Sequence, residues 1–151
     1  LDFTLSFDRS VGQEGKVGLS LGYIRYTFPN LEGTQHSEEI YGGLGLDHPL
    51  APSLQAYYDF GLMDSWYIAA GIGPEFPLDS QGTASLGFGA SLGFSDAARS
   101  FGFNDVTALV SIGINLEAFS ISPTIGFSYA DEAVNPDNSE FWGGVSISFS
   151  R

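Results

Sequence analysis

The chain has 151 residues, enough for one domain, and no run of about 18 apolar residues that could form a membrane-spanning helix. Hydrophobic residues make up 43% and charged residues only 15%, a balance that excludes an intrinsically disordered chain. The net charge of −13 argues against nucleic acid and an anionic membrane surface as partners, and the lack of cysteine excludes disulfides and thiolate metal sites.

Strand patterns begin at the N-terminus. Apolar residues alternate with Asp, Thr and Ser over residues 1–7, and residues 9–15 have the composition of a turn. The next strand is predicted over residues 17–28, where the apolar positions change parity after Tyr23. We expect a β-bulge at this point, because one extra residue would reconcile the two halves and turn Arg25 away from lipid to the inner face.

Three further strands are predicted in the middle of the chain, over residues 39–47, 54–62 and 66–78. They are preceded or separated by a polar loop at 29–37, a turn with two prolines at 48–53 and a tight hairpin at 63–65. Pro74 falls on the apolar face of the third strand. Because proline has no N–H for the ladder, we expect a bulge or a strand end there.

The clearest alternation lies in residues 84–95, ASLGFGASLGFS. One face of this strand carries only Ala, Leu and Phe, and the other carries only Gly and Ser. A soluble sheet turns Lys, Glu, Thr and Arg to water, whereas Gly and Ser suit the inside of a barrel, where many strands converge. Similar strands are predicted over 106–116, where Leu109 breaks the rule, and over 119–129 and 141–151.

The patterns together predict an all-β fold, an antiparallel up-and-down transmembrane β-barrel that forms a single domain over residues 1–151. About nine strands of about 8–13 residues are visible, near the length that a tilted strand needs to cross a bilayer. Single-chain bacterial barrels have even strand numbers, so we expect 10 or more strands in the full protein, with one or more N-terminal strands and a signal peptide missing here. A miscounted hairpin would leave eight strands, and a soluble lipocalin-like barrel with the apolar face inside is the alternative fold.

Aromatic residues support the membrane interpretation because they gather near the two ends of the predicted strands, as in the aromatic girdles of membrane barrels. Those near the longer loops are Tyr26, Phe28, Tyr58, Phe60, Trp66, Tyr129 and Phe141. Those near the short turns are Phe76, Phe119 and Phe149.

Four segments, GLSLGYIRYTFPN, EEIYGGLGLD, LQAYYDFG and WYIAAGIGPEFPL, resemble the bacterial family of conserved hypothetical proteins called Gcw_chp. The resemblance covers roughly residues 15–96. It implies an outer-membrane barrel of unknown function and a full length greater than that of this chain. It supplies no functional residues.

Residues that point inward by parity are the candidate pore lining. With Arg25 turned inward by the bulge, they are Arg25, Glu39, Tyr41, Gln55, Tyr57, Asp59, Tyr67 and Glu75. One interpretation is a structural network in which Arg25 balances the carboxylates, since charges in a narrow barrel must be paired or hydrated. The other is a lining that attracts cations, by the logic of acidic rings in cation pathways.

No catalytic, cofactor or metal site is expected. His36, in a predicted loop beside Glu38 and Glu39, could form an acid–histidine pair, but general base catalysis needs an oriented partner and a second catalytic group. His48 lies in a proline-rich turn. The acidic loop at 130–140 offers oxygen ligands for Ca²⁺ from Asp131, Glu132, Asp137 and Glu140, but its spacing matches no EF-hand, and a solvated acidic loop is favoured.

The expected function follows from the predicted barrel. We expect a protein of the bacterial outer membrane that acts as a small porin-like channel for neutral or cationic solutes and is not an enzyme. The alternative is a structural barrel, without a transport role, that anchors or accompanies a larger envelope assembly. The expected partners are the lipid bilayer with its lipopolysaccharide and other envelope proteins, and no nucleic acid.

Overall fold

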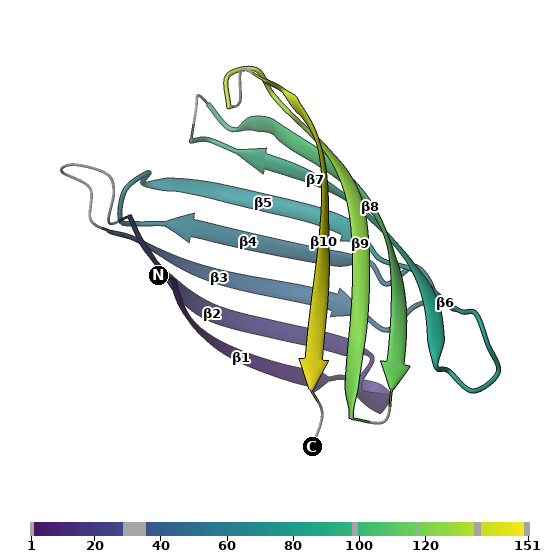
Figure 1. Ribbon diagram of the computed structural model, residues 1–151. Coiled ribbons are helices and arrows are strands. Elements are labelled where there is room, and N and C mark those ends of the chain that lie inside the picture. Colours follow the sequence, from purple (N-terminus) through teal and green to yellow (C-terminus); the bar gives the residue numbers. More distant parts are fainter. Residues whose placement is uncertain (1, 29–35, 98–99, 117, 135–136, 150–151) are drawn as a thin grey trace. The chain divides into compact units, whose positions relative to one another are not determined.

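The structure is a computed structural model that describes residues 2–28, 36–97, 100–116, 118–134 and 137–149. Ten strands and one short 3-10 turn lie in this described part of the chain (Figure 1). Their bounds are β1 Phe3–Val11, η1 Gln13–Gly15, β2 Val17–Thr27, β3 His36–Leu46, β4 Ser53–Asp59, β5 Ser65–Ile72, β6 Glu75–Pro77, β7 Ala84–Ser95, β8 Gly102–Leu116, β9 Phe119–Ala130 and β10 Ser139–Phe149. Parts of the predicted terminal strands and loops, namely residues 1, 29–35, 98–99, 117, 135–136 and 150–151, lie outside the described residues.

The strands form one antiparallel sheet in up-and-down order, β1-β2-β3-β4-β5-β7-β8-β9-β10, with β6 paired to β7. The predicted all-β, up-and-down topology is therefore confirmed. The predicted strand at 84–95 has the same bounds in the structure, and the one at 66–78 is divided at Pro74 into β5 and β6, as expected from the missing N–H. The predicted turn at 9–15 is shorter, because β1 continues to Val11.

The sheet is not closed into a barrel in the described residues. β1 and β10 stand at the two ends of the strand order, and each pairs with one neighbour only. The backbone N–H and C=O groups along these two edges therefore lack partners from a further strand.

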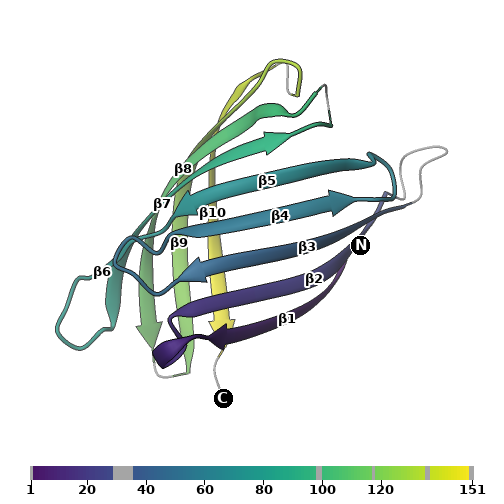
Figure 2. The same ribbon diagram turned by 180° about the vertical axis from the view of Figure 1, so that it is seen from behind.

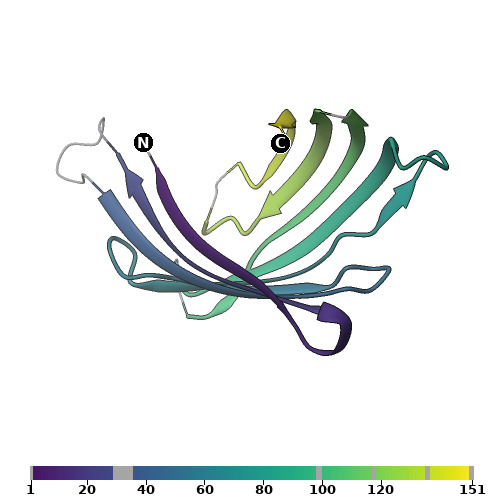
Figure 3. The same cartoon turned by 90° about the horizontal axis from the view of Figure 1, so that it is seen from below.

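The chain divides into two compact units. The first comprises residues 1–48, 52–70 and 93–103, and the second comprises residues 49–51, 71–92 and 104–151. In the first unit β2, β3 and β4 lie side by side, as Figure 2 shows from behind. The η1 turn, drawn in purple in Figure 3, joins β1 to β2.

Each unit has one apolar and one polar face. In the first unit Leu19, Leu44 and Leu54 lie opposite one another across β2, β3 and β4, and the alternating residues form the other face. In the second unit the apolar residues of β8, β9 and β10 likewise face one another, for example Ala108, Phe127 and Phe141. We call these surfaces the apolar face, and the opposite ones, which carry mostly Gly, Ser, Thr and Tyr, the polar face.

The predicted bulge in β2 is wrong. The pairing of β2 with β3 runs without interruption from Val17 to Thr27, and the pairing of β2 with β1 is equally regular. Arg25 therefore lies on the apolar face with Tyr23, and not on the inner face as predicted. The reason is electrostatic: Arg25 lies opposite Glu38, so the cation is paired where it stands and needs no bulge to move it.

The apolar face is exposed. No apolar side chain is buried in the described part of the chain, and Phe88 and Leu92 in β7 are 42% and 48% exposed. At the far end of the second unit the exposed fraction reaches 84% for Phe141. In the lipocalin-like alternative these side chains would form the core, which is not what the structure shows. Exposed apolar surfaces of this kind mark contacts with a membrane or with other protein chains.

None of the helical segments in the described residues is long and apolar enough to cross a membrane.

Candidate functional site: the polar face and its tyrosine row

The charges on the polar face are all negative in the described strands. In the first unit they are Asp8, Glu39 and Asp59, and in the second Glu75, Asp105 and Glu140. The two described strand cations, Arg9 and Arg25, lie on the apolar face. The polar face therefore carries carboxylates that no Lys or Arg of the described strands can balance.

Glu39 and Asp59 lie directly opposite each other across β3 and β4. The Asp59 carboxylate has several hydrogen-bond donors: it accepts the Ser37 hydroxyl at 2.9 and 2.7 Å and the backbone N–H groups of Gly61, Leu62 and Met63 at 3.0, 2.9 and 3.1 Å. Asp59 thereby closes the turn after β4, which is a structural role. Like charges directly opposite each other in a sheet repel. The Asp59 carboxylate therefore stabilises the turn but is repelled by the Glu39 carboxylate.

Glu39 is less strongly held. Its half-buried carboxylate accepts one hydrogen bond, from the Tyr26 hydroxyl at 3.4 Å. Tyr26 was predicted to lie in the outer aromatic girdle, but the regular register of β2 places it on the polar face. Of the two opposed carboxylates, Glu39 has the greater acceptor capacity left for a ligand.

Three tyrosine rings stand in a row beside these carboxylates. Tyr41 in β3 lies opposite Tyr57 in β4, with ring centroids 5.5 Å apart, and Tyr57 lies 6.0 Å from Tyr67 in β5. The Tyr57 hydroxyl also donates a hydrogen bond to the Gln55 side chain. The alternation along the strands predicted that these side chains share one face of the sheet, and in the structure they do.

Glu75, the remaining predicted pore-lining residue, belongs to the second unit. It lies in β6 opposite Gly87, on the polar face. A Cβ built on Gly113 would lie 3.8 Å from its Oε1. Its surroundings are therefore the small residues of β7 and β8.

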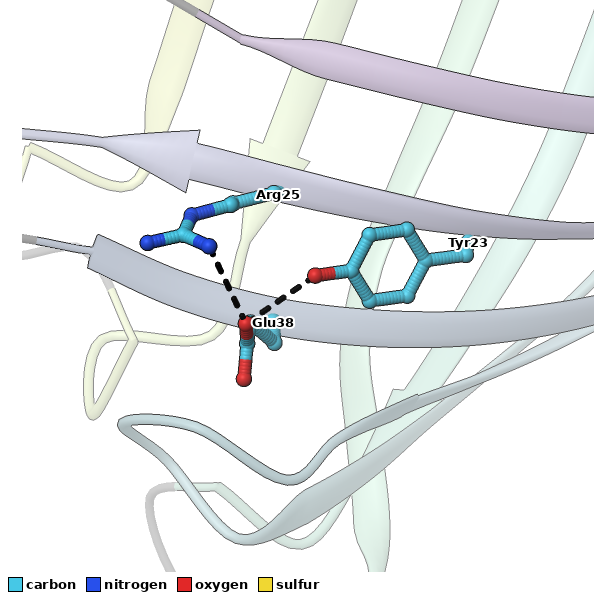
Figure 4. Close-up of polar contacts among 3 residues, drawn as sticks. All are labelled: Tyr23, Arg25 and Glu38. Atoms are coloured by element: carbon cyan, nitrogen blue, oxygen red, sulfur yellow. Dashed lines mark hydrogen bonds and ion pairs between the residues drawn. The ribbon is translucent and has the colours of Figure 1, made fainter.

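Arg25 forms a separate polar group on the apolar face, with Tyr23 and Glu38 (Figure 4). The Tyr23 hydroxyl donates to Glu38 Oε1 at 3.0 Å, and Arg25 Nη1 lies 3.7 Å from the same oxygen. The Tyr23 ring is also 6.5 Å from that of Phe60. The predicted network in which Arg25 balances the inward carboxylates is therefore wrong, since its partner is on the other face.

Glycines on the polar face make room for aromatic rings on the neighbouring strand. A Cβ on Gly22 would lie 2.3 Å from the ring of Tyr41, and one on Gly126 would lie 2.4 Å from the ring of Trp142. Each ring lies directly opposite its glycine in the ladder. The rings therefore cover the backbone of the facing strand, as in the pairing of aromatic residues with glycine in designed sheets.

Leu109 follows the same rule. It lies on the polar face of β8, and a Cβ on Gly89 would come within 2.8 Å of its side chain. The residue that breaks the small-residue pattern of its strand is thus matched by a glycine on the next one.

Two hollows distinguish the faces. On the second unit a groove of about 760 Å³ is lined almost wholly by apolar side chains, among them Phe88, Ala108, Ile125 and Phe141. On the first unit a smaller hollow of about 280 Å³ is lined mainly by polar residues, among them Asp8, Arg9, Ser20, Ser53 and Gln55. The apolar groove suits hydrocarbon, and the polar hollow suits water or a polar solute.

Sequence reasoning missed Ser37, which it placed in a loop. Ser37 is 2% exposed, and its hydroxyl both donates to Asp59 and accepts the N–H of Leu62. His36, also predicted in the loop, is the first residue of β3. The signal that could have placed both was the pairing of Arg25 with Glu38, which fixes the register of β2 and β3.

The candidate metal and catalytic residues are not brought into a recognisable centre. Within the described ranges no three His, Cys, Asp or Glu side chains gather in a way that could hold a metal ion. Asn135 and Pro136 of the acidic loop lie outside those ranges. The prediction that the chain is not an enzyme stays a prediction.

No family model, no curated protein and no solved structure matches the chain. The resemblance to the Gcw_chp family therefore stays a prediction that rests on the strand patterns.

Proposed function

We propose that the chain forms a closed β-barrel in the bacterial outer membrane, where it conducts small neutral or cationic solutes. The observation that carries the proposal is the sorting of charge between the faces. In the described strands, the polar face carries six carboxylates, Asp8, Glu39, Asp59, Glu75, Asp105 and Glu140, and the cations Arg9 and Arg25 are on the apolar face. A water-filled interior lined in this way favours cations over anions.

The membrane location is supported by the exposure of the apolar face. Apolar side chains such as Leu21 and Ile125, one in each unit, are 61% and 69% exposed, and the described residues include no buried apolar core. In water this surface would be an aggregation site, whereas in a bilayer it meets acyl chains. The apolar groove of the second unit offers such chains a fitting surface.

Closure of the sheet follows from the same location. In hydrocarbon each unpaired backbone N–H or C=O group costs several kcal/mol, so a spanning sheet keeps no open edge. The edges of β1 and β10 must therefore be paired in the membrane, with each other or with further strands. Closure leaves the polar face on the inside.

The test is ion selectivity in a planar lipid bilayer. The full chain is reconstituted, a KCl gradient is applied, and the reversal potential is measured. We expect a potential of the sign that marks cation preference, and we expect Glu39→Gln to move it towards zero. Glu38→Gln is the matched control, because Glu38 is the next residue along β3 but lies on the apolar face.

Three results would overturn the proposal. They are a preference for anions, an equal effect of Glu38→Gln and Glu39→Gln, and the absence of conductance from a barrel that has inserted. Insertion is checked independently by the need for detergent extraction and by a heat-dependent gel shift. An inserted but silent barrel supports the structural role in an envelope assembly instead.

A further inference from the structure

The tyrosine row of the first unit consists of Tyr41, Tyr57 and Tyr67, on three successive strands. Tyr41 covers Gly22, which accounts for its position. Tyr57 lies directly opposite Tyr41, and Tyr67 continues the row with its ring centroid 6.0 Å from that of Tyr57. All three side chains are only half-buried, so the row presents aromatic surface on the polar face.

The row lies next to an electrostatic imbalance. Glu39 is two residues before Tyr41 on the same face of β3, and Tyr57 is its diagonal neighbour on β4. The carboxylate opposite Glu39 belongs to Asp59, which is fixed by the turn that it closes. A cation bound beside Glu39 would relieve the repulsion between these two groups.

We propose that Tyr41, Tyr57 and Tyr67, together with Glu39, form a binding site for organic ammonium cations. The face of an aromatic ring attracts a cation within about 6 Å of its centroid, and groups of such rings recognise quaternary ammonium ligands. The carboxylate supplies the countercharge, and the rings supply the apolar contact that the methyl groups of an ammonium ion need. The inference names the class of solute for the channel proposed above, and it rests on that proposal for the exposure of the polar face to water.

The chemistry favours an organic cation over a metal ion. Divalent cations such as Ca²⁺ need six to eight oxygen ligands, whereas this site offers the two carboxylates of Glu39 and Asp59, and Asp59 already accepts hydrogen bonds from Ser37 and three backbone N–H groups. Potassium has no apolar groups to place on the rings. Tetramethylammonium and choline have both the charge and the methyl groups.

The experiment is a titration of the detergent-solubilised full chain with choline, in which isothermal titration calorimetry measures the affinity. Tyr57→Leu removes a ring from the middle of the row, and we expect it to weaken choline binding by between about 2-fold and 30-fold, the range that one cation–π contact spans. Tyr57→Phe keeps the ring and is expected to bind choline as the unaltered chain does. Glu39→Gln is expected to weaken binding as well.

Tyr58→Phe is a matched control, since Tyr58 is the next residue of β4 on the apolar face and should not affect choline. If Tyr57→Leu fails to fold, Tyr67→Leu takes its place at the end of the row. Equal affinity in the ring-deleted and unaltered chains, or no choline binding by the unaltered chain, would overturn the inference.

The outcome separates this inference from the proposed channel. If the chain conducts cations selectively but the tyrosine substitutions leave its choline affinity unchanged, the proposed channel is supported and the proposed binding site is refuted. If choline binding depends on Tyr57 but the inserted barrel does not conduct, the binding site is supported and the proposed channel is refuted.

Discussion

The glycine beneath the Trp142 ring is a position at which one added methyl group has a defined consequence. A Cβ on Gly126 would lie 2.4 Å from Trp142 Cζ2 and 2.5 Å from Cε2. The indole is also fixed by a hydrogen bond from Nε1 to Ser128 Oγ at 3.1 Å. Gly126→Ala therefore forces the ring aside and breaks that hydrogen bond.

The magnitude follows from three contributions. Overpacking by a methyl group costs about 1–3 kcal/mol. The lost hydrogen bond costs about 0.5–1.5 kcal/mol. The change from Gly to Ala returns about 0.5–1 kcal/mol of backbone entropy. We expect Gly126→Ala to lower the free energy of unfolding by about 0.5–4 kcal/mol.

Gly144 is the matched control in the same β9–β10 hairpin. A Cβ there meets no heavy atom within 4 Å, so Gly144→Ala gains the entropy without the clash. We expect this variant to be unchanged or more stable, by about 0.4–1 kcal/mol. The two substitutions are chemically identical, so a difference in sign isolates the contact with the ring.

The assay is denaturant unfolding of the reconstituted chain, followed by far-ultraviolet circular dichroism. A double-mutant cycle adds Gly126→Ala to a Trp142→Ala variant. The clash with the indole is absent there, so we expect Gly126→Ala not to lower the free energy of unfolding. If Gly126→Ala costs the same with and without the indole, or no more than Gly144→Ala, the interpretation of the glycine as space for the ring is refuted.

Three further predictions concern the faces and one turn. Leu92→Arg places a cation on the apolar face, and we expect it to reduce assembly in vesicles by about 2–4 kcal/mol, whereas Ser91→Arg on the polar face is tolerated; equal tolerance in a folding assay would contradict the assigned orientation. Glu38→Leu leaves Arg25 without its partner, so we expect it to assemble less well than the double variant Arg25→Leu/Glu38→Leu, by on the order of 1 kcal/mol, measured as folded yield on a gel. Hydrogen bonds from Thr83 and from backbone N–H groups lower the pKa of Asp79 from 3.8 to about 2, so its contribution to the turn before β7 is complete above pH 4 and is lost as pH falls through about 2; a carboxyl shift titrating near 3.8 by NMR would contradict this.

Strand positions were predictable because the alternation of apolar and polar residues, with a period of two, can be recognised within each short stretch of sequence. The face of Glu39, Tyr41 and Tyr57 followed from counting alone, and so did the break at Pro74. These are local properties, which do not depend on the neighbouring strand.

Arg25 was misplaced because its environment is not local. A cation among apolar residues suggests a bulge as long as its partner is unknown, and the partner, Glu38, lies 13 positions further along the chain. The role of Ser37 was missed for the same reason, since it depends on Asp59 in the next strand. That a glycine makes room for the ring of Tyr41 or Trp142 can likewise be predicted only when the register of the two paired strands is known.

The sorting of charges has a consequence that depends on salt. On the apolar face Arg25 and Glu38 cancel, whereas Glu39 on the polar face has a second carboxylate opposite it and no cation among the described strand residues of that face. Such a field is screened over about 10 Å at 0.1 M salt but over only about 3 Å at 1 M. If the polar face lines an aqueous passage, cation preference must therefore be strong in dilute KCl and fall steeply as KCl is raised. A reversal potential that keeps the same selectivity ratio from 0.1 to 1 M would show that the carboxylates do not set it.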